Sequence, residues 1–140
     1  MLYLTILVSG AIISDLIEDK IYNIWVVPGM LFGMALVGIQ GVGMLFNTLM
    51  MQLFILALLV PLYIIRGLGA GDIKLFMAIA PYLSRQDTLS CIINSFIIGG
   101  IISILCMIIK HRKIKTIHFA LPIGISILLN YLGINISTLF

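Results

Sequence analysis

The chain is poor in charge. Only 9% of its 140 residues are Asp, Glu, Lys or Arg, whereas 62% are hydrophobic, and the mean hydropathy is +1.27. In soluble domains about a quarter of the residues are charged, and a soluble fold of this length could not bury so much apolar surface. The composition therefore predicts an integral membrane protein. The net charge of +3 is too small to indicate a nucleic-acid partner.

Cysteine and histidine are equally scarce. The two cysteines, Cys91 and Cys106, fall in one apolar run. In a helix they would lie more than about 20 Å apart along the axis, too far for a disulfide. His111 and His118 stand apart from other ligand types, and no HExxH motif occurs. We therefore predict neither a metal site nor a cofactor.

No polar stretch is long enough to form a soluble domain. A helix needs roughly 20 apolar residues to cross a bilayer, and such runs take up nearly the whole chain. We predict one membrane-embedded, all-α domain over residues 1–140, with about six transmembrane helices. The expected spans are 1–17, 24–39, 45–65, 73–83, 89–109 and 117–132. Gly38–Gly43 is expected as a Gly-rich connection and Ser84–Thr88 as a polar turn. The short fourth span can cross only if it tilts, or if Asp72 and Lys74 already lie within the membrane profile.

The basic residues predict how these spans are oriented. Short loops rich in Lys and Arg stay in the cytoplasm. With six spans, only Arg85 falls on one side of the membrane. The other seven fall together on the opposite side: Lys20, Arg66, Lys74, Lys110, Arg112, Lys113 and Lys115. We therefore expect that side in the cytoplasm and both termini outside it, in a multi-pass protein of the cytoplasmic membrane.

Acidic residues are scarce, and four of the five cluster on the predicted cytoplasmic side. Asp87 lies alone on the far side, where solvation explains it. Asp72 follows a glycine-rich break, in which we expect the backbone to leave helical geometry. Its partner is expected to be Asp15, because this acid is embedded in an apolar run. Glu18 and Asp19 lie nearer water, although burial alone leaves Asp19 as an alternative.

Two neighbouring carboxyl groups have a chemistry of their own. Ionising both groups at short range is opposed by the repulsion between two negative charges, so the pair holds one proton. The ionised group can then take a proton from a water that attacks a peptide carbonyl, while the protonated group donates to the carbonyl oxygen. Such a site needs no metal and no covalent intermediate. The acids therefore indicate peptide hydrolysis.

These residues also resemble a known family. Gly69-Ala70-Gly71-Asp72 followed by Ile73-Lys74-Leu75 is similar to the GxGD motif of intramembrane aspartic proteases, and closest to the type IV prepilin peptidase branch. That branch also carries an acid near a stretch like Asp15–Asn23, although Tyr22 stands where the family usually has Pro. The resemblance implies Asp15 and Asp72 as the catalytic pair, with Gly69, Gly71 and Lys74 as supporting motif residues.

The same resemblance implies a substrate. It implies cleavage of the leader peptide of a prepilin or pseudopilin precursor, on the cytoplasmic side and ahead of a hydrophobic helix, with membrane lipid as the other partner. The larger members carry a methylating domain that this chain lacks, so it resembles the short forms. Lys74 either contacts substrate, tunes Asp72 or simply snorkels toward water.

Two other functions remain open from the sequence. The acids could form a proton or cation relay in a small transporter or channel component. Alternatively, the chain could be a structural assembly factor, in which Asp72 pairs with Lys74 or Arg66.

Overall fold

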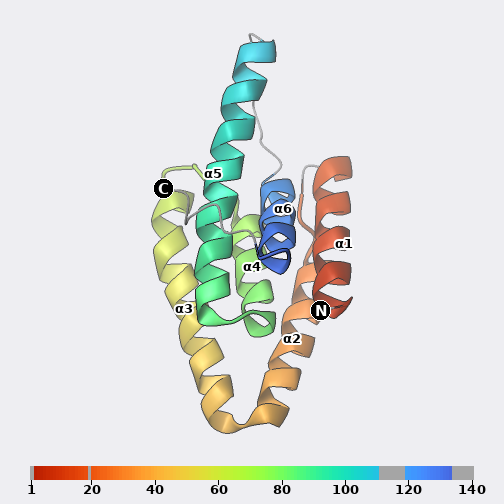
Figure 1. The fold of residues 1–140 in the computed structure, drawn as a ribbon, viewed down its shortest axis with the longest axis vertical. Coiled ribbons are helices and arrows are strands. Elements are labelled where there is room, and N and C mark those ends of the chain that lie inside the picture. The colour runs from red at the N-terminus through yellow and green to blue at the C-terminus, as the bar shows by residue number, and fades with distance from the viewer. Residues whose placement is uncertain (1, 19, 111–118, 134–140) are drawn as a thin grey trace.

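The computed structural model describes residues 2–18, 20–110 and 119–133, and within these ranges the chain is helical, without strands. The described elements, in chain order, are α1 (Leu2–Glu18), α2 (Asn23–Gln40), α3 (Val42–Ile64), α4 (Ala70–Ile79), the 3₁₀ turn η1 (Ala80–Tyr82), α5 (Arg85–Lys110) and α6 (Ala120–Tyr131) (Figure 1). The predicted all-α class is confirmed.

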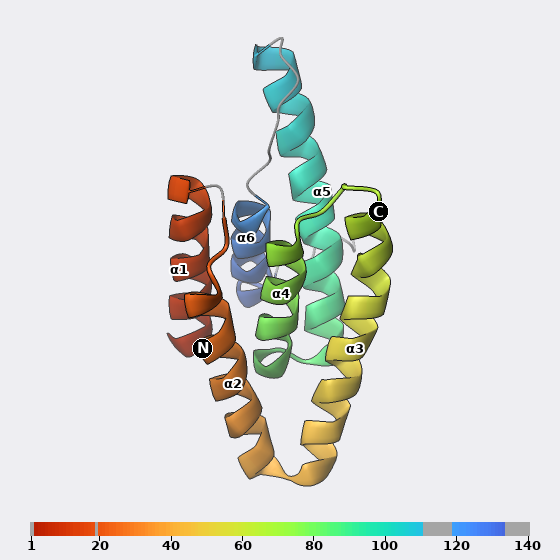
Figure 2. The ribbon, with the colours of Figure 1, turned by 180° about the vertical axis from the view of Figure 1, so that it is seen from behind.

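The short helix α4 forms the centre of the bundle. It packs against α1, α2 and α3, and Figure 2 shows it enclosed by longer helices when the molecule is seen from behind. Leu75, Phe76, Ala78 and Ile79 on α4 are fully buried. The apolar residues of α4 therefore lie at the centre of the hydrophobic core, and this packing positions the N-terminal end of the helix.

Three helices are long and apolar enough to cross a membrane. They are Asn23–Gln40, Val42–Ile64 and Arg85–Cys106. Many of their large apolar side chains point outward, such as Ile39, which is 85% exposed, and apolar surroundings suit such surfaces. This agrees with the predicted membrane class. Helices α1, α4 and α6 have 17, 10 and 12 residues, so the arrangement of six spans stays a prediction.

Helices α5 and α6 are joined by buried polar contacts. The hydroxyl of Ser126 on α6 lies 2.9 Å from the Cys91 sulfur and 2.8 Å from the Ser95 hydroxyl, both on α5. All three side chains are fully buried. Small residues and hydroxyl groups commonly hold membrane helices together in this way. Cys91 and Cys106 are free thiols, as their spacing predicts.

Two of the expected boundaries are wrong. The connection expected at Gly38–Gly43 is helical except at Gly41. The φ of 134° at this residue ends the helical conformation of α2 before α3 begins. The turn expected at Ser84–Thr88 is mostly helix, because α5 already begins at Arg85. The Ser84 hydroxyl accepts the Asp87 N–H at 3.1 Å and donates to the Asp87 carboxylate at 2.6 Å. Ser84 therefore caps α5, and Asp87 lies in the first turn of this helix instead of in a loop.

Other sequence predictions lie outside the described residues. They concern Asp19, His111, His118 and the basic stretch 111–115.

A glycine on α2 lets the 3₁₀ turn approach closely. A Cβ atom at Gly33 would lie 2.8 Å from the Tyr82 ring and 2.9 Å from Pro81 Cβ. The Tyr82 hydroxyl also donates to the Gly29 carbonyl of α2 at 2.6 Å. The turn that ends α4 is thus fastened to α2 by close packing and one hydrogen bond.

We expect Gly33→Ala to lower the thermal unfolding temperature in detergent, because the added methyl group forces η1 away from α2 at a cost of about 1–3 kcal/mol. Gly38→Ala is the matched control on the same helix, since a Cβ there meets nothing within 4 Å. Alanine favours helix by up to about 1 kcal/mol over glycine, so this variant should be as stable as the parent or more so. Equal behaviour of the two variants would contradict the proposed packing.

Candidate active site

The glycine-rich segment begins where α3 ends in a hydrogen-bonded cap. The Arg66 N–H donates to the Tyr63 carbonyl at 3.0 Å, and the Gly67 N–H to the Leu62 carbonyl at 2.8 Å. This is the Schellman pattern, in which one residue adopts the left-handed conformation. Here that residue is Arg66, with a φ of 59°. The cap turns the chain sharply, and the buried Leu68 then anchors it in the core.

Asp72 lies in the first turn of α4. Its Oδ2 accepts the backbone N–H of Gly69, the residue before the helix, at 3.0 Å. The side chain is only 9% exposed. The expected break in helical geometry is thus present up to Gly69, whereas Gly71, the last glycine of the segment, already belongs to α4. An acid in the first turn satisfies an N–H group that has no partner within the helix.

The two motif glycines allow close approach of neighbouring groups. A Cβ at Gly69 would lie 2.9 Å from Asp72 Oδ2, and one at Gly71 would lie 3.1 Å from Ile21 Cβ. Ile21 belongs to the connection between α1 and α2. Gly69 therefore makes room for the carboxylate itself, and Gly71 lets the segment that follows Asp15 pack against α4.

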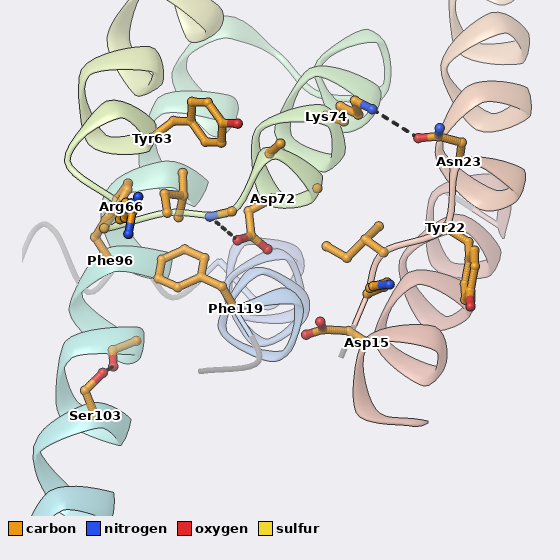
Figure 3. A pocket seen from close by; sticks show the side chains of 18 of the residues that line it. Asp15, Tyr22, Asn23, Tyr63, Arg66, Asp72, Lys74, Phe96, Ser103 and Phe119 are labelled. Atoms are coloured by element: carbon orange, nitrogen blue, oxygen red, sulfur yellow. Dashed lines mark hydrogen bonds between the residues drawn. The ribbon is translucent and has the colours of Figure 1, made fainter. Parts of the chain in front are cut away.

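Asp15 lies in the last turn of α1 and is also buried, at 8% exposure. The next two residues, Leu16 and Ile17, point outward. Figure 3 shows the carboxyl groups of Asp15 and Asp72 facing one space from opposite sides. The structure thus brings together two acids that are far apart in the chain.

That space is a cavity of about 920 Å³. Five parts of the chain line it: the end of α1 with its connection to α2, the end of α3 with the glycine segment, the start of α4, the middle of α5, and Phe119 before α6. Its lining includes Asp15, Tyr22, Asn23, Tyr63, Arg66, Asp72, Lys74, Phe96, Gly99, Ser103 and Phe119. A cavity of this size suits a segment of peptide better than an ion alone.

The two acids influence each other electrostatically. Together, three effects raise the pKa of Asp72 from 3.8 to about 6: burial is the largest and raises it, the hydrogen bond from the Gly69 N–H lowers it, and the negative charge of Asp15 raises it. A carboxyl group that titrates near neutral pH can hold or release a proton during a reaction. The site therefore has the proton chemistry of an acid pair.

Lys74 does not pair with Asp72. Its Nζ donates to the Asn23 Oδ1 at 3.3 Å, and Figure 3 shows the side chain directed toward α2. The lysine thus links the starts of α2 and α4 at the rim of the cavity. Glu18 is the acid one helical turn after Asp15, expected nearer water. It is exposed, and it accepts a hydrogen bond from the Tyr22 hydroxyl. The tyrosine in place of the family's usual proline therefore contacts the end of α1.

Sequence reasoning missed the wall that α5 and Phe119 supply. The rings of Phe96 and Phe119 pack with their centroids 5.2 Å apart, and a Cβ at Gly99 would meet the Phe119 ring at 2.8 Å. These residues lie in apolar sequence without a motif, so no local signal marks them. Asn23 is the last residue of the stretch Asp15–Asn23, and nothing in the sequence signals its contact with Lys74.

Comparison with known proteins identifies the family of the chain. No curated protein and no solved structure matches it. The model of the type IV leader peptidase family matches residues 1–104, a range that contains both acids and the glycine segment. This match covers most of the chain and includes every residue of the candidate acid pair. The chain belongs to the type IV leader peptidase family.

Proposed function

We propose that the protein is an aspartic endopeptidase in which Asp15 and Asp72 activate the hydrolytic water. The observation that carries this proposal is the meeting of two buried carboxyl groups, from α1 and α4, in one large cavity. Membership of the family supports a peptidase in general. The geometry supplies the residues that would do the chemistry.

The reaction needs one proton on the pair. We assign it to Asp72, because the pKa of this group is raised to about 6 and the protonated form is therefore more accessible than in an ordinary aspartate; Asp15 is then the ionised member. The Asp15 carboxylate accepts a proton from water as the water oxygen bonds to the carbonyl carbon, and Asp72 donates its proton to the carbonyl oxygen. Collapse of the tetrahedral intermediate breaks the C–N bond, and the proton on Asp15 passes to the leaving nitrogen. Asp72 is reprotonated from the second hydroxyl group.

The proposed substrate is a prepilin-like precursor with an N-terminal leader and a hydrophobic helix. Such a substrate suits a cavity that opens at one end of an apolar bundle, because its helix can stay in lipid while the leader enters the site. The distribution of the basic residues along the sequence favours a cytoplasmic location of this end. The six-span arrangement, with both termini outside, remains part of this proposal.

The other two interpretations gain no support. The family match favours a peptidase over a proton or cation transporter. A purely structural role for Asp72 needed an ion pair with Lys74 or Arg66. Instead, Asp72 accepts a backbone N–H, and Lys74 binds Asn23.

We expect Asp15→Asn and Asp72→Asn each to reduce cleavage of a coexpressed prepilin-like substrate on the order of a thousandfold or more, since either change removes one half of the proton transfer. Both variants should still accumulate in the membrane. Glu18→Gln is the control, because this acid is exposed and lies outside the cavity lining. Full activity of either aspartate variant would refute the proposed pair.

We expect Asp72→Asn to stabilise the folded protein at neutral pH. In the parent, the folded-state pKa is raised from 3.8 to about 6, so the charged form destabilises the fold by about 3 kcal/mol. Below about pH 4, the variant and the parent should have the same free energy of unfolding. The difference in favour of the variant should grow up to about pH 6 and then stay constant. Unfolding of both proteins in detergent across this pH range provides the measurement. If the variant were less stable than the parent at pH 7.5, the charged form of Asp72 would not be destabilising the fold, and the prediction would be wrong.

We expect the site to face the cytoplasm. In a background without Cys91 and Cys106, a cysteine at Gln86 should react with a membrane-impermeant maleimide added to intact cells. A cysteine at Lys20 should react only after the cells are broken, because it lies at the opposite end of the bundle with Asp72. Both positions are exposed, so access depends on sidedness alone. The reverse labelling pattern would invert the proposed orientation.

A further inference from the structure

Arg66 occupies a backbone position that normally selects glycine. Its φ of 59° makes it the single non-glycine residue with a positive φ in the part of the chain that the structure describes. The left-handed conformation costs a residue with a Cβ roughly 1 kcal/mol or more. The next residue is a glycine, Gly67, but the left-handed conformation falls on Arg66. Strain retained beside a candidate active site is a reason to look for a function.

The side chain of Arg66 lines the same cavity as the two acids. Figure 3 shows it beside Phe96, on the wall opposite Asp15. Within residues 2–18, 20–110 and 119–133, no salt bridge is found for its guanidinium group. The cavity is also lined by Lys20 and Lys74, so its basic residues outnumber its acids. An anionic group would therefore be attracted into it.

A structural explanation for Arg66 also exists. A cation at the C-terminal end of a helix interacts favourably with the helix dipole, by up to about 1 kcal/mol at an exposed position. That gain is no larger than the strain of the left-handed backbone, and Lys at an unstrained neighbouring position would provide it equally. The dipole alone therefore does not account for an arginine at this residue.

We propose that Arg66 binds a carboxylate side chain of the substrate peptide, near the bond that is cut, and so determines which peptides are cleaved efficiently. This inference rests on the proposed peptidase function. The guanidinium group can hold a carboxylate through two parallel hydrogen bonds, which fixes position as well as charge. The Schellman turn directs the side chain into the cavity, and Phe96 supplies an apolar surface beside it. Arg66 touches no reacting atom, so its contribution is to binding.

The first experiment separates binding from stability. We expect Arg66→Gly to unfold at the same or a higher temperature than the parent, because glycine relieves the strained backbone. Its KM for a prepilin-like peptide with an acidic residue should rise about tenfold or more, while kcat is retained. Arg66→Lys should recover part of the loss. Arg85→Gln is the matched control, since Arg85 lies at the far end of the bundle and binds Asn47.

The second experiment identifies the anionic group. A series of peptides carries a single Glu at successive positions around the cleaved bond, each with a Gln counterpart. At one position, the parent should prefer Glu to Gln, and Arg66→Gly should lose this preference. The assay is run in zwitterionic vesicles and in vesicles with anionic lipid, because a lipid phosphate would offer Arg66 similar chemistry. The preference should be the same in both.

Clear outcomes would overturn the inference. Arg66→Gly with an unchanged KM, or with a lower unfolding temperature and unchanged peptide preference, would show a structural role. An effect confined to anionic vesicles would assign the partner to lipid. Both results leave the parent enzyme cleaving its peptide, so they are distinguishable from failure of the proposed function, in which the parent cleaves nothing.

Discussion

The constraint on which the proposed site depends is the burial of two carboxyl groups, Asp15 and Asp72, beside one cavity. Burial and mutual repulsion both oppose the charged state, and they raise the pKa of Asp72 to about 6. One hydrogen bond, from the Gly69 N–H to the Asp72 carboxylate, works in the other direction. The Asp72 carboxyl group therefore passes between its neutral and charged forms near pH 6. Any larger stabilisation of the charge, such as an ion pair with Lys74, would remove the proton that acid–base chemistry requires.

Helix α4 satisfies this requirement because of its length and its glycines. Its ten residues are about half of the roughly 20 that a full span takes, and they place the first turn of the helix, with the buried Asp72, inside the bundle. Gly69 leaves space for the carboxylate, and Gly71 leaves space for Ile21 from the segment after Asp15. The spacing of the motif thus has a direct physical meaning. Gly69 accommodates the Asp72 carboxylate, and Gly71 allows the connection that follows α1, the helix of Asp15, to pack against α4.

The sequence was informative where a residue conflicts with its surroundings. Asp15 stands in an apolar run, and Asp72 follows a glycine break between two such runs, so both could be singled out without a structure. Arg66 could not, because its strain depends on a backbone turn that no composition reveals. Phe96 is one apolar residue among many, and its place at the cavity follows from tertiary packing of α5. Helix limits were misjudged around Gly41 because hydropathy marks where a chain leaves lipid, whereas a helix can continue through polar and glycine residues.

The two ends of the bundle are built differently, and this difference bears on how a peptide could enter. At the end away from the acids, side chains bind across helices: Arg85 to Asn47 at 2.9 Å, Asn130 to the Asp87 carbonyl at 3.1 Å, and Tyr82 to Gly29. At the cavity, the cross-link with Asn23 is longer, at 3.3 Å, and involves an exposed lysine. An exposed polar contact contributes little to stability. The Arg85–Asn47 bond is exposed as well, so the part-buried bonds of Tyr82 and Asn130 are the ones that tie the helices together at the end away from the acids. Entry of a peptide at the cavity, as proposed, would leave these two bonds in place.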